Sequence, residues 1–486
     1  MKKINKTMMQ YFEWYLPSDF GLWKKILEES KNISDIGITS VWLPPAYKAS
    51  DGINGVGYAV YDLYDLGEFD QKGAIRTKYG TKEEYLNAIK SLQENGVKVF
   101  ADIVLNHRLG ADGTEEVYAI EDLPSDRNVD ISKPFPIQAW TKYEFPGRRG
   151  KYSDFKWNWT HFHGVDWDEF QKRSSIYKFY GKHWDKDVDK ENGNFDYLMG
   201  ADIDLNNVDV TEELKKWGLW YAQFTNIDGF RMDAVKHMRA SFMESWLNYV
   251  RNNTNRTLPA VGEYWSTSLE NLKNYIKETN ASLSLFDVPL HYNLFNASNS
   301  GGNYDMKTIF DNTLVNSDPD LAVTFVDNHD TQLGQSLQSW VQDWFKPIAY
   351  ALILLRKDGY PCVFFGDYYG IPHDNIQSKK DILDTFIKIR RDKVYGKQND
   401  YFNDFNIIGW TIEGDEEHEN SGMAVILSDG PGGSKCMNVG KGLANSVLKD
   451  CTGNIKETVY VDNDGNGIFY CNGGSVSVWV KAVSYT

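Results

Sequence analysis

The sequence has little cysteine and no long hydrophobic run, and each absence excludes a class of protein. Only four of the 486 residues are cysteine, and none of them lies in the CxxC or Cys/His spacing of a zinc or iron–sulfur site. No run of eighteen apolar residues occurs, which excludes a transmembrane helix. We therefore expect free thiols and no association with a membrane.

The sequence also has fewer basic residues than acidic ones. Lys and Arg number 52 against 68 Asp and Glu, which leaves a net charge of −16 at pH 7. A surface for nucleic acid or anionic lipid needs a basic patch, so neither partner is expected. Residues 1–7 lack the apolar segment of a signal peptide. This predicts a cytoplasmic protein, or a secreted one whose signal sequence has been removed.

Aromatic residues, by contrast, are abundant. The chain has 16 Trp, 29 Tyr and 25 Phe. The flat C–H faces of sugar rings stack on such side chains, but a large barrel also buries many aromatics in its core. Composition alone leaves both interpretations open.

Short apolar runs that end in polar or acidic residues recur along the chain, and helical segments lie between them. The expected strands are Met8–Phe12, Ser40–Leu43, Val97–Leu105, Asp228–Arg231, Leu258–Gly262, Leu283–Phe286, Ala322–Val326 and Cys362–Phe365. Eight β/α units with functional residue types at the strand ends predict a (β/α)₈ barrel, also called a TIM barrel. An open doubly wound sheet would alternate in the same way, but no GxGxxG follows the first strand.

Helix caps and one long connection complete the predicted organisation. Thr81 and Glu84 form a capping-box pattern, and Thr211 is a candidate cap for a second helix. The connection from Asn106 to Thr211 greatly exceeds the usual loop of about 4–6 residues. After Lys397 the pattern changes to short alternating strands with Gly- and Asn-rich turns. The α/β fold is therefore predicted as a barrel in two parts (1–105 and 208–397), an inserted β-rich domain (106–207) and a C-terminal all-β sandwich (398–486).

Acidic residues at the ends of two neighbouring strands are candidates for catalysis. Arg231 and Asp233 are two residues apart on a strand and share a face, so the guanidinium would keep Asp233 ionised, as a nucleophile requires. A salt bridge at the barrel mouth is the structural alternative. Glu263 follows the next strand beside Tyr264 and Trp265, and apolar surroundings raise the pKa of a carboxyl group, as a general acid requires.

The seventh strand ends in a further acidic group. The sequence FVDNHD places Asp327, His329 and Asp330 together after this strand. Neighbouring carboxylates repel one another, so a purely structural role for all of them is not expected.

Four ordered motifs carry a specific resemblance. DIVLNH (102–107), GFRMDAVKH (229–237), the Glu of VGEYW (261–265) and FVDNHD (325–330) resemble, in order and spacing, the strand-end motifs of the α-amylase family of glycoside hydrolases. MQYFEWY (9–15), YDLYDLGEF (61–69) and GYPCVFFGD (359–367) are similar to bacterial liquefying α-amylases. The likeness extends from about Thr7 through the C-terminal region.

The resemblance implies roles for three carboxyl groups in a retaining hydrolysis. Asp233 would attack the anomeric carbon, and Glu263 would protonate the leaving oxygen and then activate water. Asp330 would grip the hydroxyls of the distorted sugar and help to keep Glu263 protonated. Retention requires the two working carboxyl groups to lie about 5–5.5 Å apart.

The resemblance also implies a set of substrate contacts. The implied substrate-binding residues are Tyr58, His107, Arg231, Lys236, His237, Trp265 and His329. Tyr58 would stack on the glucose at the cleaved bond, and Lys236 and His237 would reach sugars beyond it. For His107 and His329, burial as hydrogen-bonded barrel histidines is the alternative.

The same comparison implies a calcium site. Oxygen ligands without Cys/His clusters favour calcium over zinc. The implied ligands are Asn106, Asp196, Asp202 and the backbone carbonyl of His237, which would fasten the inserted domain to the barrel.

A second calcium and a sodium would use Asp185 and Asp204. However, His163 and Asn206 stand where the family has aspartate, and calcium affinity follows ligand charge. Asn406 similarly replaces an aspartate at a third calcium position that would involve Asp429. We therefore expect one firmly held calcium, with the other ions weak or absent.

The expected activity is endo-hydrolysis of internal α-1,4 bonds in starch, glycogen and maltodextrins by a monomer. A related maltogenic, transglycosylating or α-1,6-acting enzyme would carry the same catalytic trio. A non-catalytic glucan-binding homologue on this fold is the alternative from another class, and such proteins usually lack one of the three carboxyl groups.

Overall fold

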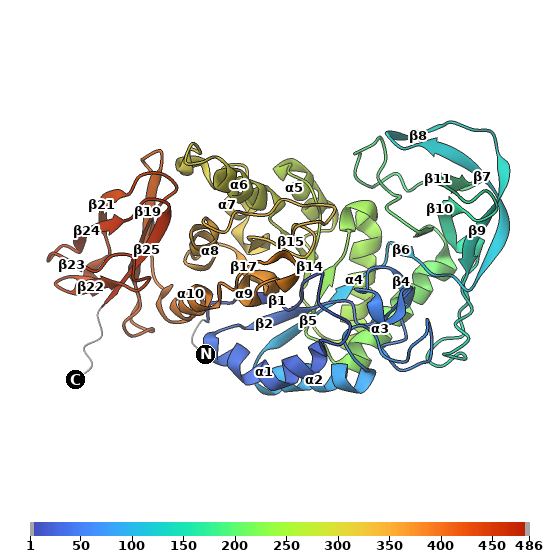
Figure 1. The fold of residues 1–486 in the computed structure, drawn as a ribbon, viewed down its shortest axis with the longest axis horizontal. Coiled ribbons are helices and arrows are strands. Elements are labelled where there is room, and N and C mark those ends of the chain that lie inside the picture. Colours follow the sequence, from blue (N-terminus) through green and yellow to red (C-terminus); the bar gives the residue numbers. More distant parts are fainter. Residues whose placement is uncertain (1–3, 482–486) are drawn as a thin grey trace.

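The computed structural model describes residues 4–481, and a closed parallel barrel lies at its centre (Figure 1). Its strands are β1 (Met8–Gln10), β2 (Ser40–Leu43), β5 (Lys98–Ile103), β13 (Gly229–Met232), β14 (Ala260–Gly262), β15 (Ser284–Phe286), β16 (Ala322–Phe325) and β17 (Tyr360–Phe364). They close in the order β1-β17-β16-β15-β14-β13-β5-β2. The barrel prediction is therefore confirmed, and each strand lies within one or two residues of its predicted run.

Helices follow the strands around the barrel because the strands are buried on both faces and need a cover. The longer ones are α1 (Leu22–Ile36), α2 (Lys82–Glu94), α3 (Val208–Thr225), α4 (Ala240–Thr254), α5 (Leu269–Glu278), α6 (Val288–Asn299), α8 (Lys346–Leu354) and α10 (Lys380–Lys393). The short α7 (Leu314–Ser317) and α9 (Phe365–Tyr369) complete the set. Thr81 and Glu84 form the predicted capping box of α2. Thr211 is not a cap: α3 begins earlier, because the side chain of Asn207 accepts the N–H groups of Asp209 and Val210.

The long connection between β5 and α3 folds into its own sheet. Its strands are β6 (His107–Arg108), β7 (Gly113–Leu123), β8 (Asp126–Asp130), β9 (Phe135–Lys142), β10 (Phe162–Asp168), β11 (Arg173–Phe179) and β12 (Ala201–Ile203). The order is β6-β12-β10-β11-β7-β8, and β9 also pairs with β7. A small sheet of β3 (Lys48–Ala49) and β4 (Val60–Asp62) lies earlier in the chain.

The C-terminal region is all β, as predicted. One sheet contains β18 (Gln398–Tyr401), β19 (Ile407–Ile412), β20 (Met423–Ser428), β25 (Ser475–Lys481), β22 (Val447–Asp450) and β23 (Thr458–Tyr460). A second contains β21 (Gly433–Asn438) and β24 (Asn466–Cys471). Figure 1 shows these strands at one end of the molecule and the β7–β11 sheet at the other, with the barrel between them. Each of the four cysteines is free, and among residues 4–481 no helix has the length and hydropathy of a membrane span.

Candidate active site

Arg231 binds three carboxyl groups at the mouth of the barrel. Its Nη1 lies 3.0 Å from Asp102 Oδ1 and 2.6 Å from Asp233 Oδ1, and its Nη2 lies 2.7 Å from Glu263 Oε2. The register of the barrel explains this arrangement, because Arg231 pairs with Asp102 on β5 and with Val261 on β14. Two nitrogens of one rigid guanidinium therefore hold Asp233 and Glu263 close together. The strand pattern predicted the Arg231–Asp233 pair but not the contact of Arg231 with Glu263.

The buried Glu263 holds a proton more tightly than an ordinary glutamate. Burial raises its pKa to about 7; Arg231 opposes this rise and the negative charge of Asp233 adds to it. Asp233 receives the shortest of the three contacts from Arg231. A protonated carboxyl group beside one that is paired with a guanidinium can supply a general acid and a nucleophile at the same bond.

A strained turn fixes the position of Glu263. Ala234, directly after Asp233, has a φ of 50°, a conformation that costs a residue with a side chain free energy and persists only where neighbouring contacts impose it. Its N–H donates to Glu263 Oε2 at 3.3 Å, and the N–H of Val235 donates to the Glu263 carbonyl at 3.0 Å. The turn after β13 thus orients the carboxyl group at the end of β14.

Asp330 and His329 follow β16 and face the same region. Asn328 Oδ1 accepts the N–H of Asp330 at 2.8 Å, and His329 Nε2 lies 3.3 Å from Asp330 Oδ2. Burial, with Glu263 as the next cause, raises the pKa of Asp330 well above its usual range. Burial lowers the pKa of His329 well below its usual value. The amide of Gln10 lies 3.0 Å from the Nδ1 of this neutral ring, which assigns the ring proton to Nε2.

Two further predicted sugar-binding residues line this mouth. The hydroxyl of Tyr58 donates to Asp102 Oδ2 at 2.7 Å, and its ring lies parallel to that of His329 with the centroids 4.9 Å apart. His107 Nε2 lies 2.9 Å from the Tyr58 carbonyl, and burial lowers the pKa of His107. A neutral His107 therefore donates its proton to this carbonyl, as expected of a hydrogen-bonded barrel histidine.

A cleft of about 890 Å³ begins at the residues after Glu263. Lys236 and Trp265 line it, and Lys236 Nζ donates to the Trp265 carbonyl at 3.0 Å and to Glu191 Oε2 at 2.7 Å. Trp265 Nε1 lies 3.4 Å from the Tyr292 hydroxyl. The cleft has room for sugar residues beyond the carboxyl groups, and aromatic rings form part of its wall.

Sequence reasoning missed Asp102 and Glu191 as site residues. Asp102 anchors Arg231, Tyr58 and also Trp42, whose Nε1 donates to it at 2.9 Å. An aspartate within an otherwise apolar central strand was the available signal, because such residues are seldom buried without a partner. No local pattern marks Glu191, which reaches Lys236 from the connection between β11 and β12.

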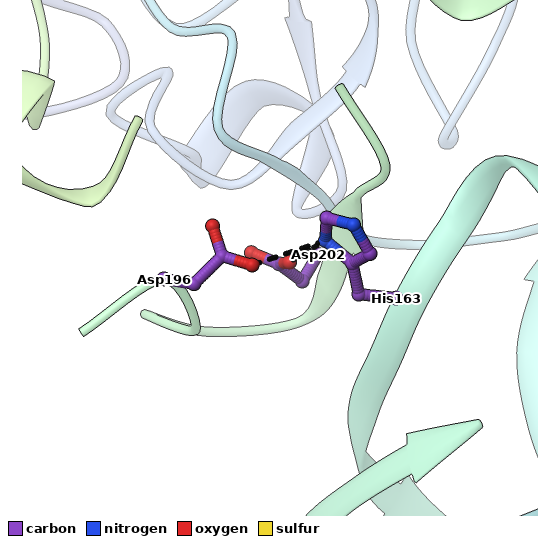
Figure 2. Close-up of side chains that lie close together, drawn as sticks. All are labelled: His163, Asp196 and Asp202. Carbon is purple, nitrogen blue, oxygen red and sulfur yellow. Dashed lines mark hydrogen bonds and ion pairs between the residues drawn. The ribbon is translucent and has the colours of Figure 1, made fainter. Parts of the chain in front are cut away.

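Two of the predicted metal ligands, Asp196 and Asp202, converge at β12. Asp196 and Asp202 are buried and converge on one point together with His163 (Figure 2). The Asn106 carbonyl accepts the N–H of Ile203 at 3.0 Å, so Asn106 flanks Asp202. His237 Nδ1 lies 2.6 Å from the carbonyl of Phe195, next to Asp196. The buried carboxylate oxygens of Asp196 and Asp202 fit calcium, a hard ion that prefers oxygen ligands.

The other predicted metal positions carry N–H donors. His163 Nδ1 lies 3.1 Å from Asp196 Oδ2 and 3.0 Å from Asp202 Oδ2, and its Nε2 lies 3.0 Å from Asp204 Oδ1. Burial lowers the pKa of His163, but these contacts outweigh it and raise that pKa well above its usual value. In the C-terminal region Asn406 Nδ2 donates to Asp429 Oδ1 at 2.7 Å.

Comparison with known proteins identifies the class and then the family. Residues 9–404 match the family model described as the α-amylase catalytic domain, and residues 424–480 match the α-amylase C-terminal model. The matched barrel is that of a glycoside hydrolase. Within that class, the chain belongs to the α-amylase family.

Relatives match nearly the whole chain. An α-amylase of Geobacillus stearothermophilus is 59% identical over 98% of this chain and 87% of its own length. A glucan 1,4-α-maltohexaosidase of Bacillus sp. (strain 707) is 53% identical over 98% and 92%. The cytoplasmic α-amylase of Escherichia coli is 43% identical over 98% and 99%. The structure of an α-amylase from Geobacillus thermoleovorans complexed with acarbose shares the fold, with a TM-score of 0.64, 16% identity and coverage of 99% and 98%.

Proposed function

We propose that this protein is an endo-acting α-amylase that hydrolyses internal α-1,4 bonds of starch, glycogen and maltodextrins with retention of configuration. The observation that carries the proposal is the Arg231 cluster. One guanidinium holds Asp233 and Glu263 together, and burial raises the pKa of Glu263 to about 7. These are the properties that a nucleophile and a general acid need in retaining hydrolysis.

In the proposed first step the Asp233 carboxylate attacks the anomeric carbon. The bond from that carbon to the leaving oxygen breaks, and Glu263 gives its proton to that oxygen. In the second step the Glu263 carboxylate takes a proton from water, whose oxygen attacks the same carbon and releases Asp233. Asp330 would hold the hydroxyls of the distorted sugar, and in its ionised form its negative charge favours the protonated form of Glu263.

The other predicted residues would bind the glucan chain on either side of the cleaved bond. Two observations support this proposal. Tyr58 and His107 lie next to Arg231 and the carboxyl groups that it binds. Lys236 and Trp265 line the adjoining cleft. His237 has two predicted roles: its ring would contact the glucan, and its backbone carbonyl would bind the metal. Its ring is engaged with Phe195, which favours the second assignment.

We further propose one calcium ion bound by Asn106, Asp196, Asp202 and the His237 carbonyl. The ion would supply structural cross-linking, because its ligands come from β12, the loop before it, the end of β5 and the turn after β13. The proposed domain boundaries lie at 105/106, 207/208 and 397/398, where the chain passes between the barrel, the inserted sheet and the C-terminal strands. We also propose that the protein is a monomer in the cytoplasm, and the name of the Escherichia coli relative, a cytoplasmic α-amylase, supports the location.

The product spectrum distinguishes endo-hydrolysis from the alternatives. Because the maltohexaosidase relative is 53% identical to this chain, the release of one defined long oligosaccharide is the alternative activity most relevant to test. Digestion of amylose, followed by chromatography of the early products, should yield a wide spread of chain lengths. If the early products are maltose alone, maltohexaose alone or cyclic glucans, the protein has the corresponding activity instead of endo-hydrolysis. Absence of any new reducing ends would favour a glucan-binding homologue.

A further inference from the structure

The motif MQYFEWY leads from β1 into the mouth of the barrel, and its Trp14 has no role in the steps above. The ring of Trp14 lies parallel to the rings of Tyr58 and His329, with the centroids 6.2 and 6.0 Å away. Tyr58 is the residue predicted to stack on the glucose at the cleaved bond. Trp14 therefore adds a third parallel ring to the aromatic wall of this site, and it is only partly buried there.

The chain on both sides of Trp14 is fixed by buried side chains. The side-chain oxygen of Gln332 accepts the Trp14 N–H at 3.0 Å, and its nitrogen donates to Glu13 Oε2 at 3.1 Å. Glu13 Oε2 also accepts the Tyr15 N–H at 2.8 Å. Gln332 and Glu13 are both buried, so these bonds are shielded from water. Because Gln332 lies two residues after Asp330, the same contacts tie Trp14 to the segment that carries this carboxyl group.

The neighbouring Tyr15 is fully engaged with the protein, whereas Trp14 is not. The Tyr15 hydroxyl donates to the Leu333 carbonyl at 2.9 Å, and its ring stacks on His373 with the centroids 3.8 Å apart. Among the contacts of residues 4–481, the indole N–H of Trp14 has no hydrogen-bond partner. A flat apolar face with one N–H donor matches the C–H face and the hydroxyls of a sugar. Because its main chain is already fixed, Trp14 would lose little conformational entropy when a ligand binds.

The order of the barrel strands places Trp14 on the glycone side, which is the part of the glucan that stays on the enzyme in the first step. β1 lies opposite β14, with β17, β16 and β15 between them in one direction and β13, β5 and β2 in the other. Glu263, which would protonate the leaving oxygen, follows β14, and the cleft beyond it contains Lys236 and Trp265. The leaving part of the glucan therefore lies on the β14 side. The glycone part extends across the Arg231 cluster toward β1.

We propose that Trp14 is a further sugar-binding residue, whose ring stacks on a glucose of the glycone part next to the one held by Tyr58. The inference rests on the proposed hydrolysis of α-glucans, because that reaction defines the two sides of the cleaved bond. The ligand is a neutral sugar ring, and neither partner in the contact uses charge. Loss of the ring should weaken substrate binding without disturbing the carboxyl groups that carry out the chemistry.

The experiment measures kcat and KM with a maltotrioside that carries a chromogenic aglycone. Release of the aglycone requires all of the glucose residues to lie on the glycone side. Trp14→Phe keeps a flat ring at this position, and Trp14→Leu keeps apolar bulk without one. Trp220→Leu is the matched control, since Trp220 is a partly buried tryptophan on α3 that stacks on Phe224 with the centroids 5.1 Å apart.

We expect Trp14→Leu to raise KM about tenfold, with kcat changed less than about twofold. A side chain that binds the substrate and the transition state equally well has this signature. Trp14→Phe should stay within about threefold of the wild-type KM, because a smaller flat ring keeps most of the stacking. Trp220→Leu should match wild type in both constants. Trp14→Met replaces Trp14→Leu if the latter does not fold.

An unchanged KM in Trp14→Leu overturns the inference. So does a fall in kcat as large as the change in KM, because the ring would then support Tyr58 and His329 rather than bind sugar. Equal KM values for Trp14→Phe and Trp14→Leu overturn it as well, since a flat ring would not matter.

If wild type releases no aglycone, the proposed function fails, and titration calorimetry with the same maltotrioside decides the inference separately. Weaker binding by Trp14→Leu than by wild type then supports the stacking role of Trp14, and equal binding overturns it.

Discussion

At the scale of single residues, the proton affinity of Glu263 connects the structure to the chemistry. Its carboxyl group is buried beside Arg231 and below the strained turn at Ala234, and it must be protonated to serve as the acid. Because its pKa is raised to about 7, the acid form persists to near-neutral pH. Above that pH the group loses its proton and the first step has no acid.

The pH profile of kcat/KM should therefore have an alkaline limb with an apparent pKa near 7. Above it kcat/KM should fall about tenfold per pH unit, since kcat/KM reports ionisations of the free enzyme. The measurement uses a blocked maltoheptaoside with saturating calcium, so that metal loss cannot imitate the effect. A profile that stays flat to about pH 9 would rule out the assigned role of Glu263.

At the scale of elements, a buried lysine joins three segments behind the site. Lys346, on α8, contacts Asp327 after β16 and Asp367 on α9, where the distance from Nζ to Asp367 Oδ1 is 2.7 Å. Asp327 also accepts the Thr331 hydroxyl at 2.6 Å. The segment that carries His329 and Asp330 is therefore fixed to the helix layer by this network.

Replacing Lys346 by Met should destabilise the fold by about 3–5 kcal/mol, because it leaves two buried carboxyl groups without their cation. Burial already raises the pKa of Asp327 to about 7, and loss of Lys346 raises it further. A carboxyl group whose pKa is raised in the folded state makes the protein less stable as the pH rises toward that raised pKa. The loss measured by guanidinium unfolding should thus be larger at pH 8 than at pH 5.

Lys307→Met is the matched control, since the Lys307 side chain forms a largely solvent-accessible pair with Asp305 and such surface pairs contribute about 0–1 kcal/mol. If both variants unfold at the same denaturant concentration, the buried network does not hold this segment.

At the scale of the whole molecule, one ion would link the β7–β11 sheet to the barrel. The proposed ligands Asp196 and Asp202 belong to the inserted sheet region, whereas the His237 carbonyl follows a barrel strand. The metal would therefore influence both the stability of the sheet and the position of the turn beside Asp233.

Chelation should lower the Tm by several degrees and reduce activity, and added calcium should restore both. Binding to the folded state contributes about 2.7 kcal/mol at a ligand concentration one hundred times Kd. Scanning calorimetry with EGTA, then with calcium or magnesium added back, makes the comparison. An unchanged Tm, or equal rescue by magnesium, would contradict an oxygen-rich calcium site of this kind.

The sequence was sufficient where structure depends on local patterns. Barrel strands are short apolar runs that end in polar residues, so their places could be predicted, and the Arg231–Asp233 pair follows from strand alternation. The capping box at Thr81 is equally local. The start of α3 was misplaced because Asn207, four residues before Thr211, offers an earlier cap.

Contacts that depend on the register between strands could not be predicted from a single sequence. Asp102 meets Arg231 only because β5 and β13 pair at that offset. His163 could be recognised as an unusual residue by comparison with the family, but its contacts with three aspartates depend on the bulge in β10. Such pairings require the three-dimensional arrangement of strands that lie far apart in the chain.

The most direct test of the account follows the configuration of the first product by time-resolved proton NMR during cleavage of maltoheptaose. Double displacement through Asp233 predicts that the new reducing end appears first as the α anomer and then mutarotates. Asp233→Asn, the control, should release no product while still binding the glucan. Initial appearance of the β anomer, or undiminished turnover by Asp233→Asn, would contradict a covalent intermediate on Asp233.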